Sequence, residues 1–190
     1  MDYTKNITDY LKKEIQIIDS LSIEDLNIVM NILESARKSK RQIFIMGNGG
    51  SGATASHFVC DFNKGISDGK DNFIPYKFIC LNDNVPSMLA ISNDISYDDI
   101  FLHQLKCFFT PGDIVIGISG SGNSKNIIKA IEYANANEGV TIGFEGYDGG
   151  LLKKIAKYNI HVNVNDMQIT EDVHMIFDHC MMKILNKIAE

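Results

Sequence analysis

Two short apolar runs in this chain each lead into a loop rich in glycine and serine, and each loop is followed by a run with helical spacing. Residues 41–46 lead into 47–52 (GNGGSG), and residues 113–118 lead into 119–124 (SGSGNS). A strand that turns into a helix in this way points backbone N–H groups and the positive end of the helix dipole at one place. Glycines let the main chain approach a ligand closely, and serine hydroxyls add neutral donors. The two loops predict a phosphorylated metabolite at the carboxyl edge of a parallel sheet.

The rest of the chain alternates between short apolar runs and amphipathic segments. Strands are expected at residues 42–46, 76–81, 113–118, 140–144 and 160–164, and helices at 51–64, 85–93, 98–108, 123–137, 150–156 and 170–188. This alternation predicts an α/β fold with an open, largely parallel sheet flanked by helices, as in flavodoxin-like and Rossmann-like domains. Residues 40–190 form this core of a single domain. Residues 1–39 precede it as two helices, with a capping-box-like start at Ser22 and Asp25.

Composition excludes several classes of protein. The hydrophobic content of 45% and the charged content of 22% are ordinary for a globular chain. A net charge of −6 with scattered lysines argues against nucleic acid as the main partner. No apolar run is long enough to cross a membrane and no signal peptide is recognisable, so a cytoplasmic location without a membrane partner is expected. The four cysteines are widely separated, which favours reduced, mostly buried thiols.

The first loop also matches the dinucleotide-binding pattern GxGxxG letter for letter. That pattern alone is a weak signal, because a dinucleotide site also needs an acidic residue about 20 positions further on, at the end of the second strand. Asp68 and Asp71 fall in the glycine-rich stretch 65–72, which is expected to be a surface loop, and Asp83 comes too late. A dinucleotide fold also does not require the second, serine-rich loop. The sequence therefore favours a phosphosugar ligand and no nucleotide cofactor.

Histidines and carboxylates are paired on two of the expected helices. His57 and Asp61 lie four residues apart on the helix after the first loop, so both project from one face. Glu171 and His179 are about 80° apart on the last helix, close enough to share a face. Such a set could bind zinc or another divalent cation, or transfer protons. The same spacing fits ordinary capped or partly buried histidines, and both interpretations stay open.

These motifs together resemble the sugar isomerase (SIS) domain family, specifically its phosphoheptose isomerase branch. The resemblance is carried by the first loop with His57-Phe58, residues 90–94 (AISND), residues 118–124, residues 146–150 (GYDGG), and the closing His174 and His179. The motifs occur in the expected order over nearly the whole chain. The resemblance implies a homotetramer with sites between subunits. The helices of residues 1–39 are a candidate interface, and packing on their own sheet is an equal alternative.

The resemblance also implies a reaction and a set of site residues. Members of this branch interconvert D-sedoheptulose 7-phosphate and D-glycero-D-manno-heptose 7-phosphate through a cis-enediol, at the head of bacterial heptose synthesis for lipopolysaccharide or capsule. The implied substrate-binding residues are Asn48, Gly49, Gly50, Ser51, Asp94, Ser119, Gly120, Ser121, Ser124 and Glu171. The implied metal ligands are His57, Asp61, Glu171 and His179, with zinc as the expected ion. Asp61 takes the role of base and His179 that of acid.

The chain departs from the usual residues of this branch at several of these positions. Asp61 replaces a glutamate, Glu171 and Asp172 replace a glutamine and a glutamate, Ile169 an arginine, and Glu145 and Gly120 threonines. A shorter carboxylate at Asp61 could cost rate, since a misplacement of about 1 Å can cost on the order of 10²-fold. An anionic Glu171 should strengthen the binding of a hard divalent ion. We therefore expect a working isomerase with a retuned site.

Two other functions are compatible with the same residues. One branch of the family is a non-catalytic scaffold that binds the bacterial replication initiator, but that branch lacks the carboxylate and the last histidine, whereas this chain has Asp61 and His179. The other is an isomerase of a different phosphosugar, whose phosphate loops would look the same.

Overall fold

The computed structural model describes residues 1–66 and 73–188 and contains a single five-stranded sheet with the strand order β2-β1-β3-β4-β5. The strands are β1 (Ile43–Gly47), β2 (Phe78–Cys80), β3 (Ile114–Ser119), β4 (Val140–Glu145) and β5 (Tyr158–His161). Every neighbouring pair is parallel, which confirms the predicted α/β fold. After β1 the chain forms β2 on one side of β1, and it then crosses back to form β3 on the other side of β1. The carboxyl ends of β1 and β3 therefore flank the switch point where open α/β sheets bind ligands.

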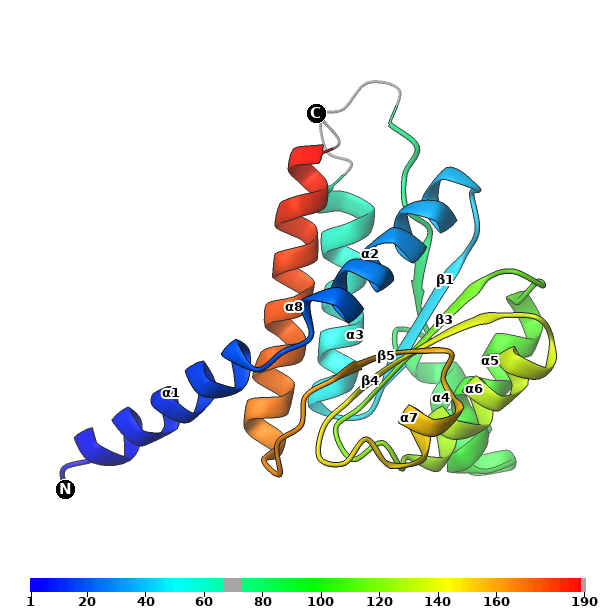
Figure 1. The fold of residues 1–190 in the computed structure, drawn as a ribbon. Helices are drawn as coiled ribbons and strands as arrows, with labels where there is room; N and C mark the ends of the chain where they lie inside the picture. The colour runs from blue at the N-terminus through cyan, green and yellow to red at the C-terminus, as the bar shows by residue number, and fades with distance from the viewer. Residues whose placement is uncertain (67–72, 189–190) are drawn as a thin grey trace.

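Helices cover both faces of this sheet (Figure 1). They are α1 (Thr4–Asp19), α2 (Ile23–Lys38), α3 (Gly50–Cys60), α4 (Val85–Asp94), α5 (Ile100–Phe108), α6 (Lys125–Ala136), α7 (Gly150–Ile155) and α8 (Met167–Ile188), with a π-helical turn η1 (Asp61–Gly65) and a 3₁₀ turn η2 (Tyr97–Asp99). Side chains of a strand alternate between the faces. Ile43 and Ile45 pack in one core with α2, α3 and α8, and Phe44 and Met46 pack in a second core with α4 to α7.

The two N-terminal helices behave differently. Helix α2 buries Leu26, Val29, Leu33 and Ala36 at helical spacing, and the side chain of Ser22 caps its start as predicted. Helix α1 has no buried residue and extends away from the rest of the structure (Figure 1). It is tied to the start of α8 by the Lys13–Asp166 ion pair at 2.7 Å and by the Tyr10 hydroxyl, which donates to Asp172. Helix α1 thus presents an apolar face that the described part of this chain leaves uncovered.

Some sequence-based boundaries were wrong. The last strand spans Tyr158–His161 rather than residues 160–164. Its ladder with β4 begins where Ile142 pairs with Tyr158 and ends where Glu145 pairs with His161. Of the four cysteines, all free thiols, only Cys80 is buried. Most of the loop expected at residues 65–72, including Asp68 and Asp71, lies outside the described residues. None of the described helices combines the length and the apolar character needed to cross a membrane.

Candidate active site

The two glycine- and serine-rich loops meet in one hollow of about 300 Å³ at the carboxyl ends of β1 and β3. The hollow is lined by Asn48, Gly49, Gly50, Ser51, Ile118, Ser119, Gly120, Ser121, Ser124, Met167 and Glu171. The structure therefore brings together nine of the ten residues that the sequence suggested for substrate binding, all except Asp94. We call this hollow the phosphate pocket.

The backbone of both loops is shaped for an anion. Gly49 has a φ of +56°, a conformation that side chains disfavour, and it stands as the N-cap of α3 without a side-chain capping bond. Asn82 braces the same loop, since its amide donates to the Gly47 carbonyl at 2.7 Å. In the second loop Ser124 is the N-cap of α6, and its hydroxyl lies 3.1 Å from that of Ser119 instead of capping the helix. Two helix starts without a side-chain cap thus point into the phosphate pocket, where a phosphate would be stabilised.

Asn48 is held in a defined orientation within this pocket. Its side-chain amide exchanges two hydrogen bonds with the buried Asn126, at 3.0 and 2.9 Å, and its carbonyl oxygen also accepts one from the Tyr97 hydroxyl at 2.9 Å. No local sequence signal points to Asn126 or Tyr97, because both reach Asn48 through the tertiary fold. A fixed amide of this kind can present its remaining N–H to a sugar hydroxyl.

Glu171 closes the pocket from helix α8. Its carboxyl atoms lie within 2.4 to 2.6 Å of the position that a Cβ on Gly50 would occupy. The absence of a side chain at Gly50 therefore allows a carboxylate to sit directly against the first phosphate loop. This placement suits a group that accepts hydrogen bonds from sugar hydroxyls near the phosphate.

A second polar cluster lies further along the same two helices. One ligand atom from each of His57, Asp61, Asp178 and His179 lies within 4.8 Å of the others. The Nε2 atoms of the two histidines are 3.1 Å apart, and the His57 Nε2 is 3.6 Å from a carboxylate oxygen of Asp61 and 3.9 Å from one of Asp178. Helices α3 and α8 lie side by side, which places the four groups opposite one another (Figure 1). We call these four residues the His–Asp cluster.

Three of the four residues suggested as metal ligands meet in this cluster, and Glu171 is not among them. Asp178, which sequence reasoning missed, takes the fourth place. Its side chain is 0% exposed and neither carboxyl oxygen has a hydrogen-bond partner. Burial, and then the charge of Asp61, raise the pKa of Asp178 to about 7. The signal that could have found it is its spacing of seven residues from Glu171, which places both on one helix face.

Two other residues singled out by the motifs lie outside both groups. Asp94 is exposed at the end of α4, where it accepts a hydrogen bond from the Asn93 amide at 2.8 Å, and it does not line the phosphate pocket. His174 is fully buried against the Phe144 ring, and burial lowers its pKa to about 4. His174 is therefore a neutral core residue of α8.

Comparison with known proteins agrees with this geometry. The model of the SIS domain matches residues 2–146. The chain belongs to the SIS domain family. It is 34% identical to a probable phosphoheptose isomerase of Thermoplasma acidophilum over 94% of this chain and 96% of that protein. It is 33% identical to the phosphoheptose isomerase of Aliarcobacter butzleri over 90% and 88% of the two chains.

Solved structures share the fold. The phosphoheptose isomerase of Neisseria gonorrhoeae superposes with a TM-score of 0.88 at 23% identity, covering 98% of this chain and 100% of that one. The phosphoheptose isomerase of Francisella tularensis superposes with a TM-score of 0.89 at 24% identity and the same coverage. The fold that carries the phosphate pocket and the His–Asp cluster is thus shared with these two phosphoheptose isomerases.

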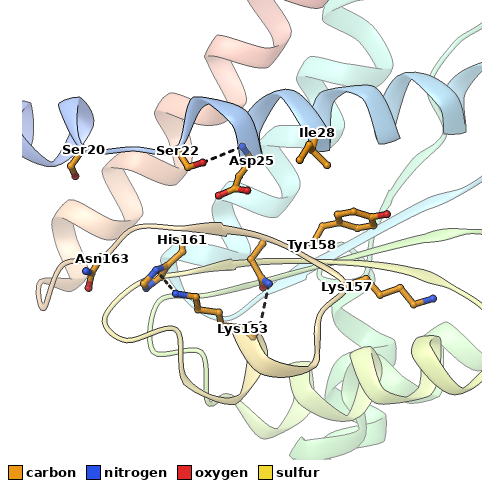
Figure 2. Close-up of a pocket in the computed structure, with 10 residues that line it drawn as sticks. Ser20, Ser22, Asp25, Ile28, Lys153, Lys157, Tyr158, His161 and Asn163 are labelled. Carbon is orange, nitrogen blue, oxygen red and sulfur yellow. Dashed lines mark hydrogen bonds between the residues drawn. The ribbon is translucent and has the colours of Figure 1, made fainter.

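A larger hollow, of about 450 Å³, lies at the β5 edge of this SIS domain, between the start of α2 and helix α7 (Figure 2). Lys153 and His161 point toward one another there, with the Lys153 Nζ 2.8 Å from the His161 Nδ1, and the Asn159 amide donates to the Lys153 carbonyl. None of the residues suggested for catalysis or substrate binding lines this hollow. We take the phosphate pocket and the His–Asp cluster as the candidate active site, because helix starts, hydroxyls and groups able to transfer protons converge there.

The same edge of the sheet buries an unpaired carboxyl group, that of Glu145. Its side chain is 0% exposed and neither oxygen has a hydrogen-bond partner. The side-chain oxygen of Asn159 also has no hydrogen-bond partner. This oxygen and a carboxyl oxygen of Glu145 lie 2.9 and 2.7 Å from the position that a Cβ on Gly143 would occupy. Burial raises the pKa of Glu145 to about 8, although the charge of Lys153 opposes the shift. A carboxyl group whose pKa is higher in the folded state stabilises the fold when protonated, and this contribution is lost as the pH rises through the folded-state pKa.

We expect Glu145→Gln to be more stable than the wild type at neutral pH and nearly equal to it at pH 4.5. The difference in the free energy of unfolding should grow between pH 4.5 and 8 and reach about 3 kcal/mol near pH 7, because pH 7 lies about 2.5 units above the ordinary glutamate pKa of 4.5 and each unit contributes about 1.4 kcal/mol. Urea unfolding of both proteins at several pH values measures this difference. A difference that does not change with pH would contradict a neutral, buried Glu145.

Proposed function

We propose that this SIS domain is a phosphoheptose isomerase, which interconverts D-sedoheptulose 7-phosphate and D-glycero-D-manno-heptose 7-phosphate. The observation that carries the proposal is the placement of the phosphate pocket and the His–Asp cluster along one pair of helices. Relatives of at least 30% identity that are named phosphoheptose isomerase support it. The reaction would open bacterial heptose synthesis for lipopolysaccharide or capsule, in the cytoplasm.

The separation of the two groups fits the length of a seven-carbon sugar phosphate. Gly50 and His57 are seven residues apart on α3, and Glu171 and His179 are eight apart on α8. At 1.5 Å per residue these spacings correspond to roughly 10 to 12 Å along the helices. An extended heptose phosphate has eight bonds between C1 and the phosphorus. An extended polypeptide advances about 1.2 Å per bond, and at the same advance the sugar phosphate spans roughly 10 Å. A phosphate in the pocket would thus place C1 and C2 near the His–Asp cluster.

The residues of the two groups can be given chemical roles. Ser51, Ser119 and Ser124, with the starts of α3 and α6, would hold the phosphate. Aldose–ketose isomerisation breaks a C–H bond at one of C1 and C2, forms one at the other, and moves a proton between their oxygens. Asp61 would carry the carbon-bound proton through the cis-enediol, and His179 would exchange the proton of the oxygens. A divalent cation, expected to be zinc, would polarise the carbonyl group when bound at the cluster.

The choice of substrate can be tested with ketose phosphates of different length. We expect aldose phosphate to form from sedoheptulose 7-phosphate with a kcat/KM at least tenfold above that for fructose 6-phosphate or ribulose 5-phosphate, since the shorter chains cannot span both groups. Turnover confined to a shorter sugar would replace the proposed substrate. Binding of all three without turnover would favour a non-catalytic scaffold.

We also infer a homotetramer with active sites between subunits. The apolar face of α1 supports this inference, because Ile7, Leu11 and Ile15 are 58%, 51% and 59% exposed in the single chain. We expect Leu11→Glu to lower the mass measured by light scattering and to reduce turnover. Lys12→Glu, which introduces the same side chain next to this face, should leave the mass unchanged. An unchanged mass in Leu11→Glu would contradict an interface at α1.

A further inference from the structure

The fourth member of the His–Asp cluster is an unusual carboxylate. Asp178 is completely buried, yet neither of its oxygens has a hydrogen-bond partner, and one of them faces the Nε2 atom of His57 at 3.9 Å. A buried carboxylate is costly unless a partner compensates it, and such groups are commonly paired or bound to a metal. Its unpaired oxygens thus point to a ligand at this place.

The distances within the cluster match those around a tetrahedral zinc ion. Zinc binds histidine nitrogens and carboxylate oxygens at about 2.0 to 2.2 Å, so the ligand atoms of a tetrahedral site lie roughly 3.3 to 3.6 Å from one another. The three distances from the His57 Nε2, to His179, Asp61 and Asp178, are 3.1, 3.6 and 3.9 Å. The remaining pairs of ligand atoms lie within 4.8 Å of one another, so shifts of up to about 1 Å would bring all four atoms into a ligand shell.

Glu171 cannot join this shell without leaving its own place. Its carboxyl group lies against Gly50 at the phosphate pocket. Asp178 is seven residues further along the same face of α8, which is about 10 Å along the helix. Glu171 and Asp178 therefore lie at different ends of the candidate active site.

We propose that Asp178, and not Glu171, completes the metal site with His57, Asp61 and His179, and that Glu171 contacts the sugar near its phosphate. This inference rests on the proposed function for the identity of the sugar. Two carboxylates balance the charge of a divalent cation, and a set of two imidazoles and two carboxylates suits zinc. Proton transfer can use the same side chains, because a carboxylate has a second oxygen and an imidazole a second nitrogen.

Metal affinity of the full-length chain tests the assignment without relying on turnover. After removal of metal with a chelator, zinc binding is measured by competition with a chromophoric chelator, and coordination is read from the visible absorption of the cobalt-loaded protein. We expect Asp178→Asn to weaken zinc binding by about 100-fold or more and to change the cobalt spectrum, since even outer-shell changes cost 10- to 100-fold. Glu171→Gln, the matched change of a carboxylate to an amide on the same helix, should stay within about threefold of the wild type.

One further variant and one assay make the result decisive. Asp178→Glu keeps the carboxylate and should recover part of the zinc affinity, whereas a purely structural defect would not be rescued. Loss of affinity in Glu171→Gln alone, or unchanged affinity in both amide variants, would overturn the assignment. Turnover of sedoheptulose 7-phosphate is assayed separately. If zinc binding depends on Asp178 but the wild type has no turnover, the proposed function fails and the metal site stands.

Discussion

Replacing Asp61 with asparagine should lower kcat for sedoheptulose 7-phosphate by about 10² to 10⁴-fold, the range supplied by a positioned acid or base. An amide cannot accept the proton that isomerisation takes from carbon. Asp61 starts the π-helical turn that continues α3, and its carboxylate lies 3.6 Å from the His57 Nε2. Turns of this kind are frequent at functional sites. Steady-state kinetics with the metal-loaded protein measure the loss.

The fold should survive this change, because asparagine has nearly the same shape as aspartate. We expect the circular dichroism spectrum and the oligomer mass of Asp61→Asn to match the wild type. Asp25→Asn, the same substitution at an exposed position in the first turn of α2, serves as the control and should keep full activity. Wild-type turnover in Asp61→Asn would remove Asp61 from the chemistry, whatever the metal content.

Adding a single methyl group at Gly50 should also be severe for catalysis and mild for the fold. The new Cβ would lie 2.4 Å from the Glu171 carboxylate, which must then leave the phosphate pocket. Gly50 does not have a positive φ, so alanine can adopt its backbone conformation, and alanine is the better helix former. We expect kcat/KM to fall on the order of 10²-fold, the cost of a misplacement of about 1 Å, with no loss of thermal stability.

A double-mutant cycle identifies the cause of that loss. In a Glu171→Ala background the new methyl group has no carboxylate to displace, so Gly50→Ala should then have little further effect. Contacting residues show such non-additivity, whereas independent residues do not. Equal losses in both backgrounds would show that Gly50→Ala acts through the backbone of the loop instead of Glu171.

The phosphate pocket was predictable because its signals are local. Each loop follows an apolar strand and precedes a helix, and the carboxyl ends of adjacent parallel strands meet at one edge. Each loop holds its glycines and serines within six residues, directly after an apolar run. This pattern alone places the two loops at the carboxyl ends of β1 and β3. The same reasoning failed at β5, where Val162 and Val164 are apolar and buried but lie beyond the end of the partner strand β4. The length of an edge strand depends on its neighbour as well as on its own sequence.

The membership of the His–Asp cluster was only partly predictable for a different reason. Which residues of α8 face α3 depends on the rotation of α8 about its own axis. That rotation is set by a buried stripe, Ile169, Val173, Phe177 and Met181, which packs into the core beside the sheet. Spacing alone placed Glu171 and His179 on a shared face. The stripe turns the face that carries both Glu171 and Asp178 toward α3, and their separation of about 10 Å along the axis leaves Glu171 near the loops and Asp178 in the cluster. Asn126 and Tyr97 were missed because their hydrogen bonds to Asn48 span 78 and 49 residues.

The most direct test of the central claim follows carbon-bound protons during the reaction. Zinc-loaded protein is incubated with sedoheptulose 7-phosphate in deuterated water, and the C1 and C2 protons are observed by NMR. An isomerase that works through a cis-enediol should introduce deuterium at these carbons while an aldose phosphate accumulates. Binding of the phosphosugar with neither exchange nor aldose formation would contradict the account.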